Sequence, residues 1–326
     1  MIERLKKLPK IELHLHLDGS LSLSLARQLS GLSIDEVKER MIAPDKCENL
    51  DEYLTRFSFP CRLMQTRESL MLLSKDLADR LAEQNILYAE VRFAPMLHNE
   101  KGLSYDEIVE AVLTGVQSHP NVKINLILCM MRGALKEDNL KTIETARKYL
   151  NKGVCALDLA GSDQYPIEDY YEFFDKAKAY HIPFTIHAGE NSNADEVKKA
   201  IHCGASRIGH GIHAIDSKEV IELLKEKNIL LEICPTSNVQ TNSVDIYDNH
   251  PLKDLYQLAV PVCINTDDST VSHISLSEEY IKLYHYFHFT IDDFKQMNIN
   301  AIEGAFLNEK EKEEILQQYH QWFLDN

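Results

Sequence analysis

The feature that most constrains the fold of this chain is an alternation between short apolar runs and longer amphipathic segments. Eight runs rich in apolar or β-branched residues recur along the sequence. They cover residues 11–17, 87–93, 122–131, 154–159, 182–187, 207–209, 229–234 and 260–265, and the sixth is the weakest. The segments between them have helical spacing and charged faces, as at residues 105–117, 139–150, 167–180, 195–202 and 217–227.

Eight such βα units predict an α/β protein with a (β/α)8 TIM barrel. The alternative is an open doubly wound sheet, which usually carries a glycine-rich phosphate loop after its first strand, and neither GxGxxG nor GxxxxGK occurs here. No repeat or flexible linker divides the chain, so we expect a single domain over residues 1–326.

The segment of residues 20–86 is too long for one crossover helix, and it predicts extra helices that form a lid over the barrel mouth. Leu54, Phe57 and Phe59 are candidates for the inner surface of this lid. Packing in the ordinary core explains these three side chains equally well at this point.

Charge and cysteine content narrow the classes of function. A formal net charge of −16 argues against a nucleic-acid partner, which needs a basic face, and favours a small neutral substrate. The first residues, MIERLKKLPK, lack the apolar stretch of a secretory signal, and no run is long enough to span a membrane, so we expect a cytoplasmic protein. Seven cysteines without close pairs are expected to be buried, reduced thiols.

Histidine and aspartate residues at the ends of predicted strands indicate a metal site. Because residues two apart in a strand point the same way, His14 and His16 project together, although a structural role for this pair stays open. His187 and Asp267 end two other predicted strands and face the same mouth of the barrel. Three histidines and one aspartate suit zinc with one open position, and the ligand types alone do not exclude iron or manganese.

Three further residues are candidates for proton transfer and substrate contact. His210 lies in RIGHG, where the glycines favour an exposed functional ring, and it is expected to handle the attacking water. Glu190, in HAGE, is the expected general acid, with a helix N-terminal carboxylate as the structural alternative. Asp268 cannot point the same way as Asp267, so we expect it to face the substrate unless it caps the next helix.

The motifs LPKIELHLHLDGSL, DLAG, HAGE, RIGHG, CPTSN and NTDDS occur in this order, and together they resemble the adenosine deaminases of the amidohydrolase superfamily. The similarity begins near Leu8 and extends through Asp268 into the C-terminal helices. Other catalytic signatures are missing from the sequence, namely GxSxG, HExxH and HxE with PCxxC.

The resemblance implies hydrolysis of adenosine, and of 2′-deoxyadenosine, to inosine and ammonia, with one Zn²⁺ per chain. It implies that activated water attacks purine C6, that Glu190 protonates N1 and that His210 orients or deprotonates the water. A larger set of residues would bind the ion or the substrate. The metal ligands would be His14, His16, His187 and Asp267, and the substrate contacts would be His16, Asp18 at the ribose 5′-hydroxyl, Gly161 at N3 and a protonated Asp268 at N7.

Several alternatives remain open from the sequence. Relatives that act on adenine or aminodeoxyfutalosine commonly have HLEG where this chain has HLDG, so Asp18 favours a nucleoside. An anionic Asp18 also disfavours a 5′-phosphate. A metal-dependent phosphoesterase and an inactive nucleoside-binding relative are the more distant alternatives. We expect no nucleic-acid or membrane partner, and either a monomer or a homodimer.

Overall fold

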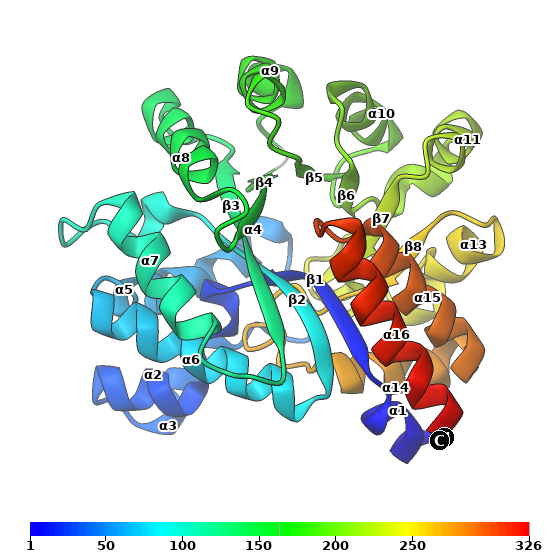
Figure 1. Ribbon diagram of the computed structural model, residues 1–326, viewed down its shortest axis with the longest axis horizontal. Helices are drawn as coiled ribbons and strands as arrows, with labels where there is room; N and C mark the ends of the chain where they lie inside the picture. Colours follow the sequence, from blue (N-terminus) through cyan, green and yellow to red (C-terminus); the bar gives the residue numbers. More distant parts are fainter. Residues whose placement is uncertain (163, 326) are drawn as a thin grey trace.

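The computed structural model describes residues 1–162 and 164–325, and its centre is a ring of eight parallel strands (Figure 1). Each strand pairs in parallel with the next in the chain, within two four-stranded sheets of order β1-β2-β3-β4 and β5-β6-β7-β8. The strands are β1 (Lys10–His16), β2 (Ile86–Phe93), β3 (Lys123–Met131), β4 (Val154–Ala160), β5 (Thr185–Ala188), β6 (Arg207–His210), β7 (Leu230–Ile233) and β8 (Val262–Ile264).

Single bridges connect the two sheets at both seams. Between β4 and β5, the Leu157 N–H donates to the Pro183 carbonyl at 3.0 Å. Between β8 and β1, the His16 N–H donates to the Asp267 carbonyl at 2.7 Å, and the Asp267 N–H donates to the His14 carbonyl at 3.0 Å. The sheet therefore closes on itself, which confirms the predicted barrel and excludes the open doubly wound sheet.

Helices surround the strands, and Figure 1 shows α7 to α11 arranged around the outside of the ring. The major helices that follow β2 to β8 are α7 (Tyr105–Val116), α8 (Lys136–Tyr149), α9 (Tyr171–Ala179), α10 (Ala194–Cys203), α11 (Lys218–Glu226), α13 (Leu252–Gln257), α14 (Leu276–Phe287), α15 (Ile291–Gly304) and α16 (Glu309–Asp325). Local signals fix their starts, as in α7, where the Ser104 side chain and Glu107 form a capping box. In the described part of the chain, no helix is both long and apolar enough to cross a membrane.

The long connection between β1 and β2 folds into several short helices, as the sequence predicts. They are η1 (Asp18–Ser20), α2 (Leu23–Ser30), α3 (Ile34–Met41), α4 (Leu50–Leu54), η2 (Thr55–Phe57), α5 (Ser58–Leu63) and the longer α6 (Arg67–Glu83). Leu54 and Phe57 line a cavity at the barrel mouth, whereas Phe59 packs in the main hydrophobic core. A lid function for this segment stays a prediction.

The remaining short elements complete the loops and the base of the barrel. They are α1 (Ile2–Lys7), η3 (Pro95–His98), η4 (Ile167–Tyr170), η5 (Ile212–Asp216), α12 (Pro235–Gln240) and η6 (Tyr247–Asn249). All seven cysteines are free thiols, and all except the partly exposed Cys61 are buried. This agrees with the expectation of reduced cysteines.

The interior of the barrel contains a network of buried ion pairs. Arg92 on β2 contacts Asp158 at 3.1 Å and Glu232 at 2.7 Å. Arg207 on β6 contacts the other oxygen of Glu232 at 2.6 Å and Glu90 at 2.5 Å. None of these five side chains is exposed, so their mutual pairing offsets the cost of removing the charges from water.

Candidate active site

Four side chains at the C-terminal end of the barrel bring their ligand atoms together. They are His14 and His16 from β1, His187 from β5 and Asp267, which follows β8, and these atoms all lie within 4.8 Å of one another. Asp267 Oδ1 lies 3.2 Å from His14 Nε2 and 3.4 Å from His16 Nε2. The structure therefore brings together the four residues that the sequence predicts as metal ligands.

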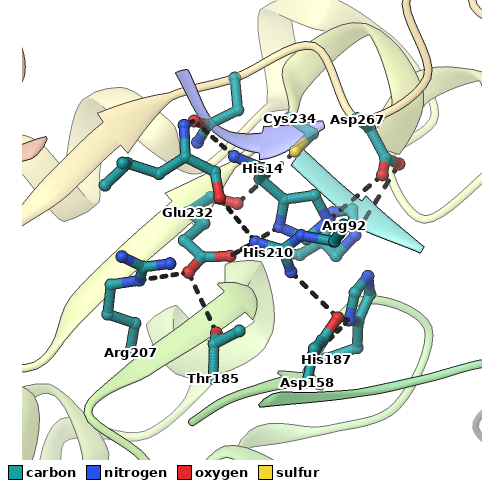
Figure 2. Close-up of polar contacts among 12 residues, drawn as sticks. His14, Arg92, Asp158, Thr185, His187, Arg207, His210, Glu232, Cys234 and Asp267 are labelled. Atoms are coloured by element: carbon teal, nitrogen blue, oxygen red, sulfur yellow. Dashed lines mark hydrogen bonds and ion pairs between the residues drawn. The ribbon is translucent and has the colours of Figure 1, made fainter. Parts of the chain in front are cut away.

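Carboxylates behind the site fix the orientation of two of these histidines (Figure 2). His14 Nδ1 lies 2.7 Å from Glu232 Oε2, and His187 Nδ1 lies 3.1 Å from Asp158 Oδ1. Because an ionised carboxylate only accepts hydrogen bonds, each Nδ1 carries a proton, and Nε2 is the ring nitrogen that each histidine turns towards the site. Arg92 and Arg207 hold the pKa of Glu232 well below its usual value, against the opposing effect of burial.

The donor set fits a divalent transition-metal ion. His14 Nε2 is buried, and its polar neighbour at 3.2 Å is Oδ1 of Asp267, another of the proposed ligand atoms. Burial, the largest cause, holds the pKa of His16 well below its usual value, so that imidazole is neutral and available as a ligand. A second group formed by His14, His210, Cys234 and Asp267 also converges. Burial raises the pKa of the Cys234 thiol well above its usual value, which makes this second group the poorer one.

His210 lies beside this cluster and belongs to a directional hydrogen-bond chain. The Leu252 N–H donates to His250 Nδ1 at 3.1 Å, so the neutral His250 ring carries its proton on Nε2. That Nε2 lies 3.2 Å from Asn238 Oδ1, and Asn238 Nδ2 lies 3.0 Å from His210 Nδ1. His210 Nδ1 is therefore an acceptor, and the neutral His210 ring carries its proton on Nε2.

The expectation of an exposed His210 ring is wrong, because only 1% of this residue is exposed. His210 still lines the cavity, and its φ of 59° places a non-glycine residue in the left-handed region. Gly209 does provide room, since a Cβ there would lie 3.0 Å from His14 Cε1. The space beside the glycine is filled by His14 of β1 and by His187 of the neighbouring strand β5, and not by solvent.

Glu190 lies 3.5 Å from His210, measured between Oε2 and Nε2, and it is 5% exposed. The Thr241 hydroxyl donates to the other carboxyl oxygen, Oε1, at 3.3 Å. Helix α10 begins at Ala194 and is capped by Asn193, so Glu190 is not the N-terminal carboxylate of that helix. Both polar contacts leave Glu190 facing the cavity that it lines.

The adjacent residues Asp267 and Asp268 point to different partners, as the sequence predicts. Asp267 Oδ2 accepts a hydrogen bond from Ser237 at 2.7 Å, and Asp268 Oδ2 accepts one from Tyr53 at 3.0 Å. The following helix α14 is capped by Ser275, which removes the capping alternative for Asp268. Burial, followed by repulsion from Asp267, raises the pKa of Asp268 well above its usual value.

These groups share one cavity of about 240 Å³. Its polar lining includes Asp18, Glu190, His210, Asp267 and Asp268. Its apolar wall is formed by Leu50, Leu54, Phe57, Ala94, Leu97, Met131 and Ala160. Among the lining residues that the structure describes there is no lysine or arginine, so the cavity has no cation for a phosphate group.

Gly161 also lines this cavity, at the end of β4. Its φ of 104° lies in a region that side chains rarely adopt, and a Cβ there would lie 3.3 Å from the Arg132 backbone nitrogen. The close approach of these two backbones explains why glycine suits this position. The structure thus places every predicted substrate-contact residue, namely His16, Asp18, Gly161 and Asp268, around one space.

Comparison with known proteins agrees with this arrangement. The family model described as adenosine deaminase matches residues 9–322. The chain belongs to the adenosine deaminase family. It is 41% identical to an adenosine deaminase of Enterococcus faecalis, with 98% of each chain covered. It is also 41% identical to an adenosine deaminase of Clostridium botulinum strain Okra, over 96% of this chain and 97% of the relative.

The structure of the N6-methyl-AMP deaminase from Arabidopsis thaliana is similar over 100% of both chains, with a TM-score of 0.88 and 26% sequence identity. This likeness extends over the barrel and the connection between β1 and β2. Membership of the adenosine deaminase family confirms the resemblance that the motifs indicate.

Several residues that build the site were not identified from the sequence. Glu232, Asn238, His250 and Tyr53 support metal-ligand or cavity side chains from other elements. Asn238 lies within the CPTSN motif. The motif marked this segment as part of the site, but it did not indicate the contact between Asn238 and His210. Glu232 is a charged residue inside an apolar strand, and that pattern was the available signal for a buried ion pair.

Proposed function

We propose that this member of the adenosine deaminase family hydrolyses adenosine and 2′-deoxyadenosine to inosine and ammonia. The observation that carries the proposal is the convergence of the four ligand atoms at the edge of a cavity that also holds Glu190 and His210. The curated relatives at 41% identity are named adenosine deaminase, which supports the same activity. We further propose that residues 1–326 act as one domain and that the protein works in the cytoplasm.

The residues that would hold a metal ion are His14, His16, His187 and Asp267. Three imidazoles and one carboxylate favour zinc over the hard cations magnesium and calcium. When bound, such an ion lowers the pKa of water at its open position to about 7 and so supplies a nucleophile at neutral pH. One ion per chain fits this set of ligands.

His210 would orient the attacking water through Nε2. The hydrogen-bond chain from Leu252 through His250 and Asn238 leaves the proton of the neutral ring on that atom. The burial that depresses the pKa of His210 keeps the ring neutral. Of the two roles implied by the family, orientation of the water therefore fits the geometry better than removal of its proton.

Glu190 would donate a proton to purine N1. Protonation at N1 withdraws electrons from C6 and makes that carbon more open to attack by water. The Thr241 hydroxyl holds Glu190 Oε1 at 3.3 Å, and Glu190 Oε2 lies on the side of His210. N1 keeps this proton in inosine, and the carboxylate left on Glu190 could then accept a proton from the attacking water and pass it to the amino group, which departs as ammonia.

Asp18, Gly161 and Asp268 would position the nucleoside. The Gly161 N–H is proposed to donate to N3, and a protonated Asp268 to N7, which accepts hydrogen bonds. Asp18 Oδ1 is buried and has no hydrogen-bond partner among the described residues, which suits a hydroxyl of the ribose. Adenine has no ribose and would leave this carboxylate unpaired, so a nucleoside fits better than a free base.

A nucleotide is the less suitable substrate. The Arabidopsis relative is named for N6-methyl-AMP, which carries a phosphate. In this chain the described lining of the cavity contains no lysine or arginine, and Asp18 would repel a phosphate. The alternatives of an adenine deaminase and of an inactive nucleoside-binding relative are separated from the proposal by the following experiment.

The test is the loss of adenosine absorbance with zinc-loaded protein, with adenine and AMP as parallel substrates. We expect turnover of adenosine, and a Glu190→Gln variant should lose about 10²- to 10⁴-fold in kcat because it has no acid to donate. Glu219→Gln, the same change on the exposed side of α11, is the matched control and should keep full activity. Chelation of the metal should abolish turnover, and zinc should restore it.

The outcomes separate the alternatives. Turnover of adenine with adenosine untouched would refute the proposed role of Asp18, although the deaminase chemistry would stand. Release of phosphate from AMP without ammonia would indicate a phosphoesterase. Binding of nucleoside without any product, with the metal loaded, would indicate an inactive relative.

A further inference from the structure

Tyr53 is a buried polar side chain that the proposed reaction does not use. It lies on α4, in the connection between β1 and β2, and only 1% of it is exposed. Its hydroxyl donates to Asp268 Oδ2 at 3.0 Å and lies 2.7 Å from Ser272 Oγ. Tyr53 and Asp268 both line the cavity.

The direction of these hydrogen bonds is determined by the number of protons. The single proton of the Tyr53 hydroxyl is donated to Asp268, so the Ser272 hydroxyl donates to the Tyr53 oxygen. The backbone of the same turn holds Ser272 beside Asp268, because the Ser272 N–H donates to the Asp268 carbonyl at 2.8 Å. The chain from Ser272 through Tyr53 thus ends on one oxygen of Asp268.

The other oxygen of Asp268 is left for a ligand. Asp268 Oδ1 is buried and has no hydrogen-bond partner among the described residues. Gly19 makes room for it, since a Cβ at that position would lie 1.8 Å from Oδ1. The carboxyl group is therefore held by Tyr53 at Oδ2, while Oδ1 occupies space that only a glycine leaves free.

The segment that carries Tyr53 is attached to the loop that carries Asp268. The Ala43 N–H donates to the Val271 carbonyl at 2.9 Å, and Ala43, Cys47, Tyr53 and Val271 form one buried apolar cluster. Phe57 packs beside the Tyr53 ring at 6.1 Å between centroids. The position of the Tyr53 hydroxyl is thus fixed relative to Asp268 by backbone and side-chain contacts.

We infer that Tyr53 is a positioning residue for substrate recognition, because its hydroxyl turns Asp268 so that Oδ1 meets N7 of the purine. This inference rests on the proposed function, in which Asp268 contacts N7. Tyr53 itself does not touch the reacting atoms. Its effect is confined to ligands that present an acceptor at position 7.

The test compares the binding of inosine and 7-deazainosine to the zinc-loaded enzyme by calorimetry. The second ligand has carbon in place of N7 and so lacks the acceptor. Tyr53→Phe should weaken the binding of inosine roughly tenfold, which is the effect expected from the loss of one hydrogen bond. The same change should alter the binding of 7-deazainosine by less than about twofold. Tyr88→Phe is the matched control, because it removes a buried hydroxyl that bonds to Glu90 and Asn125, outside the residues that line the cavity.

A second variant keeps the test decisive if Tyr53→Phe does not fold. Ser272→Ala removes the donor that orients the Tyr53 hydroxyl. This variant should also weaken the binding of inosine more than the binding of 7-deazainosine. An equal loss for both ligands would show that Tyr53 acts through packing alone, and it would overturn the inference. Unchanged binding of inosine in a folded Tyr53→Phe variant would overturn it too.

Failure of the inference can be distinguished from failure of the proposed function. If the wild-type protein deaminates adenosine but binds the two ligands equally, the N7 contact is wrong and only the inference fails. If the wild-type protein neither deaminates adenosine nor binds inosine, the proposed function fails, and the inference fails with it.

Discussion

Two sets of buried charged or polar side chains share the inside of this barrel, and they differ in how fully they are paired. In the ion-pair network, the carboxylates of Glu90, Glu232 and Asp158 each lie within 3.1 Å of a guanidinium group. At the mouth, Asp18 Oδ1 and Asp268 Oδ1 have no hydrogen-bond partner in the described part of the chain.

The difference indicates which set supports the fold and which set awaits a ligand. A buried polar atom without a partner costs about 1–3 kcal/mol, so a cluster of such atoms is retained where a bound ion or substrate supplies the missing contact. Paired charges in the interior instead hold the strands and the metal ligands in place. We therefore expect changes to the network to lower stability and changes to the mouth to lower activity.

The largest effect is expected for Glu232→Gln. This change removes the negative charge that pairs with Arg92 and Arg207, and it replaces one of the two oxygens that accept hydrogen bonds from them and from His14 Nδ1 with an NH2 group. Breaking a buried pair leaves an uncompensated charge, and we expect the free energy of unfolding to fall by about 3–5 kcal/mol in urea titrations of the metal-free protein. Asp268→Asn, the same kind of change at the mouth, breaks no ion pair and should cost less than about 1.5 kcal/mol, the size of one hydrogen bond. Equal losses in both variants would remove the distinction between the two regions.

A smaller effect is expected at Thr241, which connects the mouth to its surroundings. Thr241→Val keeps the shape of the side chain but removes the hydroxyl that donates to Glu190 Oε1. We expect kcat for adenosine to fall about tenfold, which corresponds to about 1.4 kcal/mol, with little change in KM. Thr241→Ser, which keeps a hydroxyl, should recover most of the rate. A rise in KM with unchanged kcat would instead place Thr241 in substrate binding.

The smallest effect concerns His250, which supports His210 through Asn238. Burial lowers the pKa of His250 to about 3, from an ordinary value of 6.5. As the pH falls below about 6.5, the unfolded chain takes up a proton at this residue before the folded protein does, so stability falls as the pH is lowered. At pH 6 this one residue should lower the free energy of unfolding by about 0.8 kcal/mol.

The measurement is urea unfolding at several pH values for the wild type and for His250→Gln, which has no group that titrates in this range. We plot the difference between the two free energies of unfolding against pH. Between about pH 7.5 and pH 4.5 the slope of this plot should change by an amount that corresponds to about one bound proton. Parallel curves would show that His250 does not titrate differently on folding.

The strands of the barrel and the metal ligands were predictable from the sequence because their signals are local. Strand periodicity places His14 and His16 on one face, and apolar runs end at His187 and just before Asp267. All eight predicted strands agree with the structure within about three residues at either end, as expected for boundaries set by fraying. The exposure of His210 was predicted wrongly, because the room beside Gly209 is taken up by His14 and that beside Gly211 by Leu231, both on other strands.

The sequence by itself determined the closed order of βα units and the side chains that gather at the C-terminal ends of the strands, since both depend on residues that are near one another in the chain. Only the tertiary structure decided which side chains support them. Glu232 reaches His14 across 218 residues, and Tyr53 reaches Asp268 across 215. Such contacts depend on how the elements pack, and local patterns carry no information about the partner that packing brings to each buried polar atom.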